Sequence, residues 1–172
     1  PHSEYYTVNQ NLCASIPDSV TDEEAVFTVV GSVALQGIRL SEPTFGETYL
    51  VIGLGLIGLL TCQLLISSGC RVLAIDPEFS KCSLASSFGV HSRQLTPDFD
   101  VIAWVQQFSA SGIDACIITA STSSDEPIAT AAKSCRKKGR IVLVGSTGLH
   151  LRRDLFYQKE LSFQVSCSYG PG

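Results

Sequence analysis

Three glycines and one carboxylate have the residue types and the spacing to bind a charged ligand. Gly53, Gly55 and Gly58 lie between an apolar run and a helix-like stretch, and Asp76 follows at the end of the next apolar run. In a strand–turn–helix unit, the first glycine permits the tight turn, the second lets a pyrophosphate approach the backbone, and the third lets helix and strand pack closely. The start of the helix adds unpaired N–H groups and the positive end of the helix dipole. The spacing therefore predicts binding of a dinucleotide.

Asp76 also predicts which dinucleotide is bound. A carboxylate at the end of the second strand can accept both hydroxyls of an adenosine ribose. Asp76 would repel a 2′-phosphate, Glu78 adds to that repulsion, and no arginine follows directly, so NAD is favoured over NADP. The competing interpretation is a structural glycine turn beside a solvated acid. It does not explain why glycines, strand, helix and carboxylate occur together.

Regularly alternating elements would hold these residues in place. From Thr48 onward, apolar runs alternate with helix-like stretches, and most of the runs are apolar throughout, which is typical of strands buried on both faces of a parallel sheet. The predicted strands are 48–52, 71–75, a short one near His91, 114–118, 140–144 and 161–165, and the predicted helices are 56–68, 80–88, 97–108 and 125–138, with Gly69 and Gly139 as C-terminal caps. The sequence thus predicts an α/β fold with a doubly wound parallel sheet, the Rossmann dinucleotide-binding fold.

The segment before the first of these strands is predicted to contain a lead-in and one helix. Residues 1–20, with a short strand and a proline turn, are interpreted as a remnant of a preceding catalytic domain, and residues 21–172 as the dinucleotide-binding domain. Thr21 and Glu24 have the spacing of a capping box, which would open a helix that reaches Leu40. The glycines inside that helix indicate close packing or a kink.

The composition argues against several classes of function. The 172 residues are 45% hydrophobic and 16% charged with a net charge of −4, which is typical of a globular domain and gives no general attraction to nucleic acid or to an anionic membrane. No apolar run approaches the ~20 residues that span a bilayer, and no secretory signal is recognisable. The seven cysteines are scattered without a C-x-x-C pair, so we expect reduced thiols and a cytoplasmic protein. Because the chain begins at Pro1 and contains no methionine, we expect it to be a piece of a longer protein.

Several segments resemble the coenzyme domain of the medium-chain dehydrogenases, the zinc-type alcohol and polyol dehydrogenase superfamily. HSEYYTVNQNLCASIPDSVTDEEAVFT resembles the family's passage from the catalytic into the coenzyme domain, and GETYLVIGLGLIGLLTCQLL resembles its dinucleotide turn. GIDACIITAS, GRIVLVGS and KELSFQVSCSYG resemble later strands, whose ends flank the ribose, the nicotinamide and its carboxamide. The further cofactor-binding residues that the resemblance implies are Leu56, Ile57, Lys81, Thr119, Ala120, Val144, Gly145, Ser146, Ser166, Ser168 and Ser32.

The same resemblance implies an NAD-dependent dehydrogenase or reductase. This chain would supply the nucleotide-binding half of an oxidoreductase that transfers hydride between nicotinamide and an alcohol or carbonyl substrate. A domain outside the chain would bind the small-molecule substrate, so the chain is expected to carry no catalytic residue and to be inactive alone. The end of the sequence also resembles larger oxidoreductases that contain a second nucleotide-binding module.

The resemblance bears on zinc and on oligomeric state. Most zinc ligands of the family lie in the domain that precedes this segment, and Thr28 stands about where many members carry a cysteine ligand. We therefore expect no zinc site in this chain, while zinc remains open for the parent protein. Family dimers often pair through the last strand of this domain, so a homodimer through 161–165 is expected.

Other functions fit the sequence less well. A hydrolase would need a nucleophile with a histidine partner. The chain has only three histidines, and it contains no G-x-S-x-G motif. The basic clusters CRKKGR and LRR are interpreted as a solvated helix end and a loop rather than a nucleic-acid site. A regulatory module that senses nucleotides would have no need of the dehydrogenase-like lead-in, and a methyltransferase would not need the third glycine. The regulatory module is the main alternative, because fold alone does not determine function.

Overall fold

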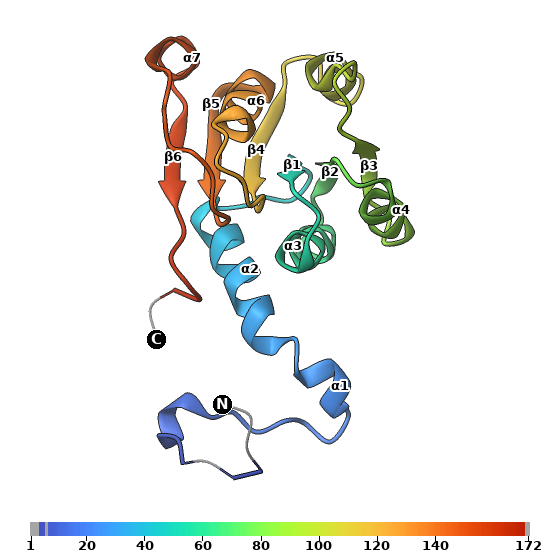
Figure 1. The fold of residues 1–172 in the computed structure, drawn as a ribbon, viewed down its shortest axis with the longest axis vertical. Helices are drawn as coiled ribbons and strands as arrows, with labels where there is room; N and C mark the ends of the chain where they lie inside the picture. The colour runs from blue at the N-terminus through green and yellow to red at the C-terminus, as the bar shows by residue number, and fades with distance from the viewer. Residues whose placement is uncertain (1–3, 6, 171–172) are drawn as a thin grey trace.

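The computed structural model describes residues 4–5 and 7–170, and its centre is a six-stranded parallel sheet (Figure 1). The strands are β1 (Thr48–Ile52), β2 (Arg71–Asp76), β3 (His91–Gln94), β4 (Ile113–Ile118), β5 (Cys135–Leu143) and β6 (Ser162–Val165). The helices are α1 (Asp22–Ala25), α2 (Thr28–Leu40), α3 (Leu56–Ser67), α4 (Phe79–Ser87), α5 (Val101–Gln106), α6 (Glu126–Ser134) and α7 (Arg153–Tyr157), with a 3-10 turn η1 at Gln10–Leu12. The alternation of strand and helix confirms the predicted α/β fold.

The order of the strands determines where a ligand can bind. In the sheet the strands follow the order β3-β2-β1-β4-β5-β6, so the chain winds outward in one direction from β1 and then in the other from β4. At such a reversal the connections leave β1 and β4 toward opposite faces, and a crevice opens at the carboxyl ends of the two strands. The fold thus places any dinucleotide site at the ends of β1 and β4.

The sheet is buried on both faces, as its apolar strands predict. All five residues of β1 are buried, and the four that follow Thr48 alternate between two hydrophobic cores. Leu50 and Ile52 face a core that includes side chains of α5 and α6. Tyr49 and Val51 face a second core with side chains of α2, α3 and α4. Because helices cover both faces, the polar ends of the strands are the accessible part of the sheet.

The segment before β1 differs from the prediction in two ways. The capping box of Thr21 and Glu24 is present, but its helix α1 ends at Ala25, and α2 begins separately at Thr28. The break falls at 26–27 rather than at a glycine, since Gly31 has open space around it and Gly37 packs against Val144, whose Cγ2 would lie 2.5 Å from an added Cβ. No strand forms in the described part of residues 4–20, so the predicted short strand is wrong. Figure 1 shows this lead-in and α1 extending away from the sheet, beyond α2.

Two predicted helices are shorter than expected. The helix predicted to continue to 138 ends at Ser134, and β5 begins directly at Cys135, so Gly139 lies inside a strand and caps no helix. The left-handed residue there is Lys138, at φ 59°. The helix predicted from 97 begins at Val101, where the Asp100 carboxylate accepts two backbone N–H groups. The basic cluster CRKKGR therefore occupies the start of β5 rather than a helix end.

Other predicted boundaries agree with the structure. Gly69 ends α3 in the left-handed conformation, at φ 78°, as a C-terminal cap. Helix α3 follows the glycine turn as predicted, although it is only partly enclosed, because Leu56 at its start is half exposed. Among the described residues, no helix has both the length and the apolar character needed to cross a bilayer.

We predict that two of the seven thiols react quickly with iodoacetamide in the native protein. Cys13 and Cys167 are exposed, whereas the other five are buried. Burial raises the pKa of the Cys62 and Cys135 thiols to about 12 and holds that of Cys116 well above its usual range, so little reactive thiolate forms at neutral pH. Mass spectrometry of labelled peptides measures this. Fast labelling of Cys62 or Cys116 under native conditions would contradict the packing described above.

Candidate dinucleotide-binding site

The three glycines form the turn between β1 and α3. Gly53 follows β1 with a left-handed φ of 99°, which favours glycine, and a Cβ there would lie 2.7 Å from the Ala120 nitrogen. Gly55 is the N-cap of α3, and a Cβ on it would meet nothing within 4 Å. A Cβ on Gly58 would collide with the carbonyl oxygen of Gly53, so this position needs glycine for the helix to approach the turn. The glycines thus have different tasks, and the open space lies beside Gly55.

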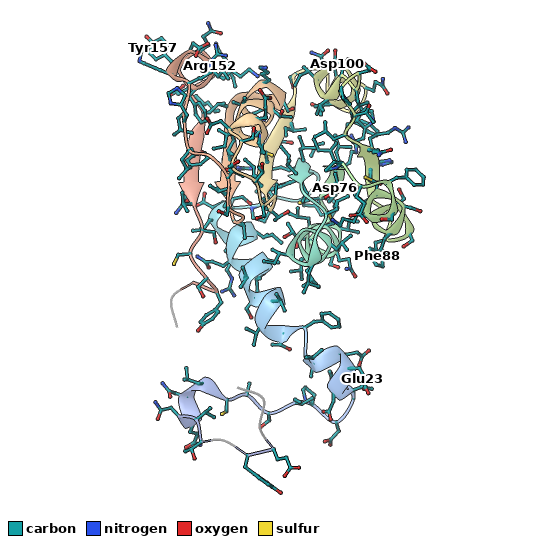
Figure 2. All side chains as sticks on the ribbon, viewed as in Figure 1. Glu23, Asp76, Phe88, Asp100, Arg152 and Tyr157 are labelled. Carbon is teal, nitrogen blue, oxygen red and sulfur yellow. The ribbon has the colours of Figure 1, made fainter. Side chains whose placement is uncertain are left out.

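Asp76 connects this turn to the end of β2. Its side chain is buried; one carboxylate oxygen accepts the N–H of Leu54 at 2.7 Å and the other accepts the N–H of Glu78 at 2.8 Å. A carboxylate has about four lone-pair positions, so each oxygen keeps one for a further donor. Figure 2 shows Asp76 beside the strands, whereas Tyr157 and Arg152 lie near α7, beyond the other end of the sheet.

A cleft of about 470 Å³ lies against the turn and Asp76. It is formed by the ends of β1, β2 and β4, the loop after β4 and the start of α6. Its walls are Ile52, Gly53, Gly55, Ile75, Asp76, Pro77, Lys81, Leu95, Thr119, Ala120, Ser121, Thr122, Ser124, Glu126 and Pro127. Six of the residues predicted from the sequence therefore line one cavity: Gly53, Gly55, Asp76, Lys81, Thr119 and Ala120.

The end of β4 is fixed to the glycine turn by Thr119. Its hydroxyl donates to the carbonyl oxygen of Gly53 at 2.6 Å, and its N–H donates to the carbonyl oxygen of Ile52 at 2.9 Å. These bonds join the two strands at which the winding of the sheet reverses, and they hold the floor of the cleft in one shape.

The end of β5 supports the cleft without lining it. The N–H of Gly145 donates to Ile118 at 2.9 Å, the N–H of Ser146 donates to Ala120 at 3.0 Å, and the carbonyl oxygen of Ser146 accepts from Thr122 at 2.8 Å. A Cβ on Gly145 would collide with the carbonyl oxygen of Ala120. Gly145 and Ser146 therefore hold the loop after β4, and their predicted direct contact with the cofactor stays a prediction.

Other predicted cofactor residues lie outside the cleft. The Ser32 hydroxyl donates to Thr28 within α2 at 2.8 Å, and Val144 packs on Gly37 of the same helix. Ser166 follows β6, with its N–H bonded to Leu143 at 2.8 Å and its hydroxyl buried without a partner among the described residues. Ser168 has a left-handed φ of 51°. Leu56, Ile57 and Gly58 form the first turn of α3, where N–H groups lack an intrahelical acceptor.

The sequence reasoning missed the hydroxyl-rich loop after β4. Ser121, Thr122, Ser124 and Glu126 line the cleft, and none of them was predicted. The signal was present as the run STSSDE directly after a predicted strand. Loops at the carboxyl ends of parallel strands meet at the ligand crevice, so such a run is a candidate for contact with a sugar or phosphate.

The described residues fit a dinucleotide better than a metal ion. The open space beside Gly55 at the start of α3 would admit a pyrophosphate, and the buried carboxylate of Asp76 lies at the adjoining strand end. Within residues 4–5 and 7–170, no three His, Cys, Asp or Glu side chains gather where they could hold a metal.

The sequence matches the model of a known protein family. The family model described as "Zinc-binding dehydrogenase" matches residues 57–172. The chain belongs to the zinc-binding dehydrogenase family. Over 113 residues it is 27% identical to (R,R)-butanediol dehydrogenase of Bacillus subtilis. This alignment covers 65% of this chain and 33% of that protein. It is 30% identical over 87 residues to the Emericella nidulans protein named "Probable D-xylulose reductase A", and this alignment covers 50% of this chain and 24% of the relative.

Solved structures have the same fold. The crystal structure of 2R,3R-butanediol dehydrogenase from Bacillus subtilis matches with a TM-score of 0.82 and 22% identity, over 90% of this chain and 45% of that one. An alcohol dehydrogenase from Escherichia coli CFT073 in complex with NADH matches with a TM-score of 0.82 and 23% identity, over 94% and 48%. A Sinorhizobium meliloti protein described as a "putative zinc-binding dehydrogenase" and bound to NADP matches with a TM-score of 0.77 and 24% identity, over 88% of this chain and 46% of that one. The aligned part of this chain thus spans about half the length of the solved relatives, and the shorter segments aligned by sequence cover a third or less of the two proteins named above.

We predict that two alanine substitutions in the turn affect different properties, NADH binding at Gly55 and stability at Gly58. Gly55→Ala should lower the free energy of unfolding by no more than about 1 kcal/mol, because its backbone is extended and its Cβ meets no atom. It should nevertheless weaken NADH binding by tenfold or more, on the order of 1.4 kcal/mol, because the Cβ occupies the space beside the helix start. Gly58→Ala should destabilise the fold by roughly 1–3 kcal/mol.

Thermal unfolding and fluorescence titration with NADH separate the two effects. If Gly55→Ala bound NADH as tightly as the wild type does, the assignment of the pyrophosphate to this turn would be wrong.

Proposed function

We propose that this chain binds NAD in the cleft beside Asp76, as the coenzyme domain of an alcohol- or polyol-dehydrogenase-type oxidoreductase. The observation that carries the proposal is the carboxylate of Asp76, which is buried at the cleft and bonded to the glycine turn through Leu54. Membership of a dehydrogenase family supports it, and the relatives named above are dehydrogenases and a reductase. No observation favours the regulatory module.

The residues of the cleft suggest how the cofactor is held. The N–H groups at the start of α3 would bind the pyrophosphate, and Asp76 would accept the hydroxyls of the adenosine ribose with its remaining lone pairs. The loop around Thr119 and Ala120 and the ends of β5 and β6, including Gly145, would border the ribose and nicotinamide. The nicotinamide supplies hydride chemistry when bound, and the rest of the protein would present the alcohol or carbonyl carbon.

The charges around the strand end support NAD over NADP. A 2′-phosphate would lie against the carboxylate of Asp76 and close to that of Glu78. Lys81 is the basic residue that lines the cleft, and it is paired with Glu78 at 2.9 Å. Structural relatives include one bound to NADH and one bound to NADP. Family membership therefore does not determine which of the two cofactors binds, and the proposed preference for NAD rests on the local charges.

A homodimer through β6 is part of the proposal. β6 is an edge strand whose only partner in the described sheet is β5, and Val165 on it is 54% exposed. Pairing with a second β6 would satisfy the open edge. Sedimentation at micromolar concentration should give twice the chain mass, and a monomer at all concentrations would contradict this arrangement.

We also propose a reducing compartment, the cytoplasm, as the location of the protein. All seven cysteines are free thiols, and five of them are buried. A disulfide-permissive compartment would expose Cys13 and Cys167 to oxidation. Cell fractionation of the parent protein would check this location.

We predict that the protein binds NADH more tightly than NADPH and that Asp76→Ala narrows the difference. The substitution removes an acceptor for the ribose hydroxyls and a charge that repels the 2′-phosphate. NADH affinity should fall by tenfold or more, about 1.4 kcal/mol, while NADPH affinity falls less.

Asp114→Ala provides a matched control. Asp114 also accepts a backbone N–H from a neighbouring strand, that of Thr48 at 2.8 Å, and it pairs with Arg136, but it lies at the start of β4, away from the cleft. It should lower stability and leave the NADH to NADPH ratio unchanged. If Asp76→Ala kept the full preference for NADH over NADPH, another residue would have to recognise the ribose.

A further inference from the structure

We propose that Glu78 disfavours NADP chiefly by engaging Lys81, so that the cleft contains a cation able to bind a 2′-phosphate but held by an internal carboxylate. This inference deepens the proposed function and rests on it. It separates two ways in which an acid near the ribose could act. The acid could repel the phosphate directly, or it could occupy the basic group that the phosphate needs.

The geometry of the pair supports the second way. The Lys81 ammonium lies 2.9 Å from the Glu78 carboxylate, and the Ser80 hydroxyl donates to the other oxygen of the same carboxylate. Lys81 lines the cleft together with Asp76, whereas Glu78 does not. The lysine that borders the cleft is thus paired with a carboxylate outside its lining, and the backbone of Glu78 is fixed beside the strand end because its N–H donates to Asp76 at 2.8 Å.

The charges show why a free Lys81 would attract a phosphate. The hydrogen bond to Glu78, with the charges of Asp76 and Glu78, raises the pKa of the Lys81 ammonium, so this group is a cation at neutral pH. Ammonium groups bind phosphate oxygens through charge-assisted hydrogen bonds. With Glu78 in place, the ammonium of Lys81 is already paired with a carboxylate, so a 2′-phosphate would have to compete with Glu78 for it.

The ion pair can be removed without disturbing the fold. Its side chains are 41% exposed at Lys81 and 56% exposed at Glu78, and exposed ion pairs contribute little to stability. Glu78 is the N-cap residue of α4 but makes no side-chain capping bond. Glu78→Ala should therefore fold as the wild type does, which a thermal unfolding curve verifies before any binding measurement.

The experiment is a double-mutant cycle read by fluorescence titration. Dissociation constants for NADH and NADPH are measured for the wild type, Glu78→Ala, Lys81→Gln and the double variant. Glu78→Ala should tighten NADPH binding about threefold to fivefold, because the exposed ion pair holds Lys81 only weakly, with little change for NADH. In the Lys81→Gln background, the same substitution should change NADPH binding by less than about 1.5-fold. Because Asp76 is retained in every variant, the preference for NADH over NADPH should become smaller in Glu78→Ala but should not reverse.

Glu160→Ala is the matched control. Glu160 pairs with Lys138 at 3.7 Å, with both side chains largely exposed, and the pair lies at the start of β5, away from the cleft. Removing Glu160 lowers the negative charge of the protein by the same amount as removing Glu78 and also frees a lysine. It should leave the affinities for both dinucleotides unchanged.

Two results would overturn the inference while leaving the proposed function intact. An equal gain in NADPH affinity with and without Lys81 would show that Glu78 acts by direct repulsion, and no gain in either background would show that Glu78 does not influence the choice. A wild-type protein that binds neither dinucleotide would instead refute the proposed function and this inference together.

Discussion

The carboxylate of Asp76 is the group on which the geometry of the cleft depends. It accepts the N–H of Leu54 in the β1–α3 turn and the N–H of Glu78 in the β2–α4 turn, so a single side chain sets the spacing of two loops that come from neighbouring strands. Burying a carboxylate is costly unless its oxygens are hydrogen-bonded, and these two N–H groups satisfy it. The remaining lone pairs are available to the cleft. Local structure and the proposed ligand contact therefore involve the same atoms.

The fold was predictable because its signals are local and repeated. Uninterrupted apolar runs such as 48–52 fit only strands covered on both faces, and Gly69 and Thr21 give clear helix boundaries. The errors arose where tertiary contacts override local pattern. Residues 135–138 read as the end of a helix by their charge, but Cys135 pairs with Ile113 of β4 and draws the segment into the sheet. The lead-in was predicted to form a strand, but in the described residues it has no partner strand with which to pair.

The candidate site was predictable in part, for a related reason. Gly53, Gly55 and Asp76 follow from a strand–turn–helix pattern that has a mechanical requirement at each position. Thr119 and Ala120 came from family resemblance, and the structure places them on the same cleft. The run STSSDE after a predicted strand marked the loop after β4 as a candidate, but which of its residues reach the cleft, such as Thr122 and Glu126, depends on how the loop folds back over the strand ends. The ion pair between Lys81 and Glu78 was likewise not predicted from the sequence, because each residue was interpreted separately as a neighbour of the ribose.

The most direct test of this account is a crystal structure of the protein with NAD bound. The account predicts that the pyrophosphate lies at the first turn of α3 beside Gly55, and that a hydroxyl of the adenosine ribose is within hydrogen-bond distance of Asp76. A dinucleotide bound elsewhere, or an Asp76 carboxylate turned away from the ribose, would contradict it.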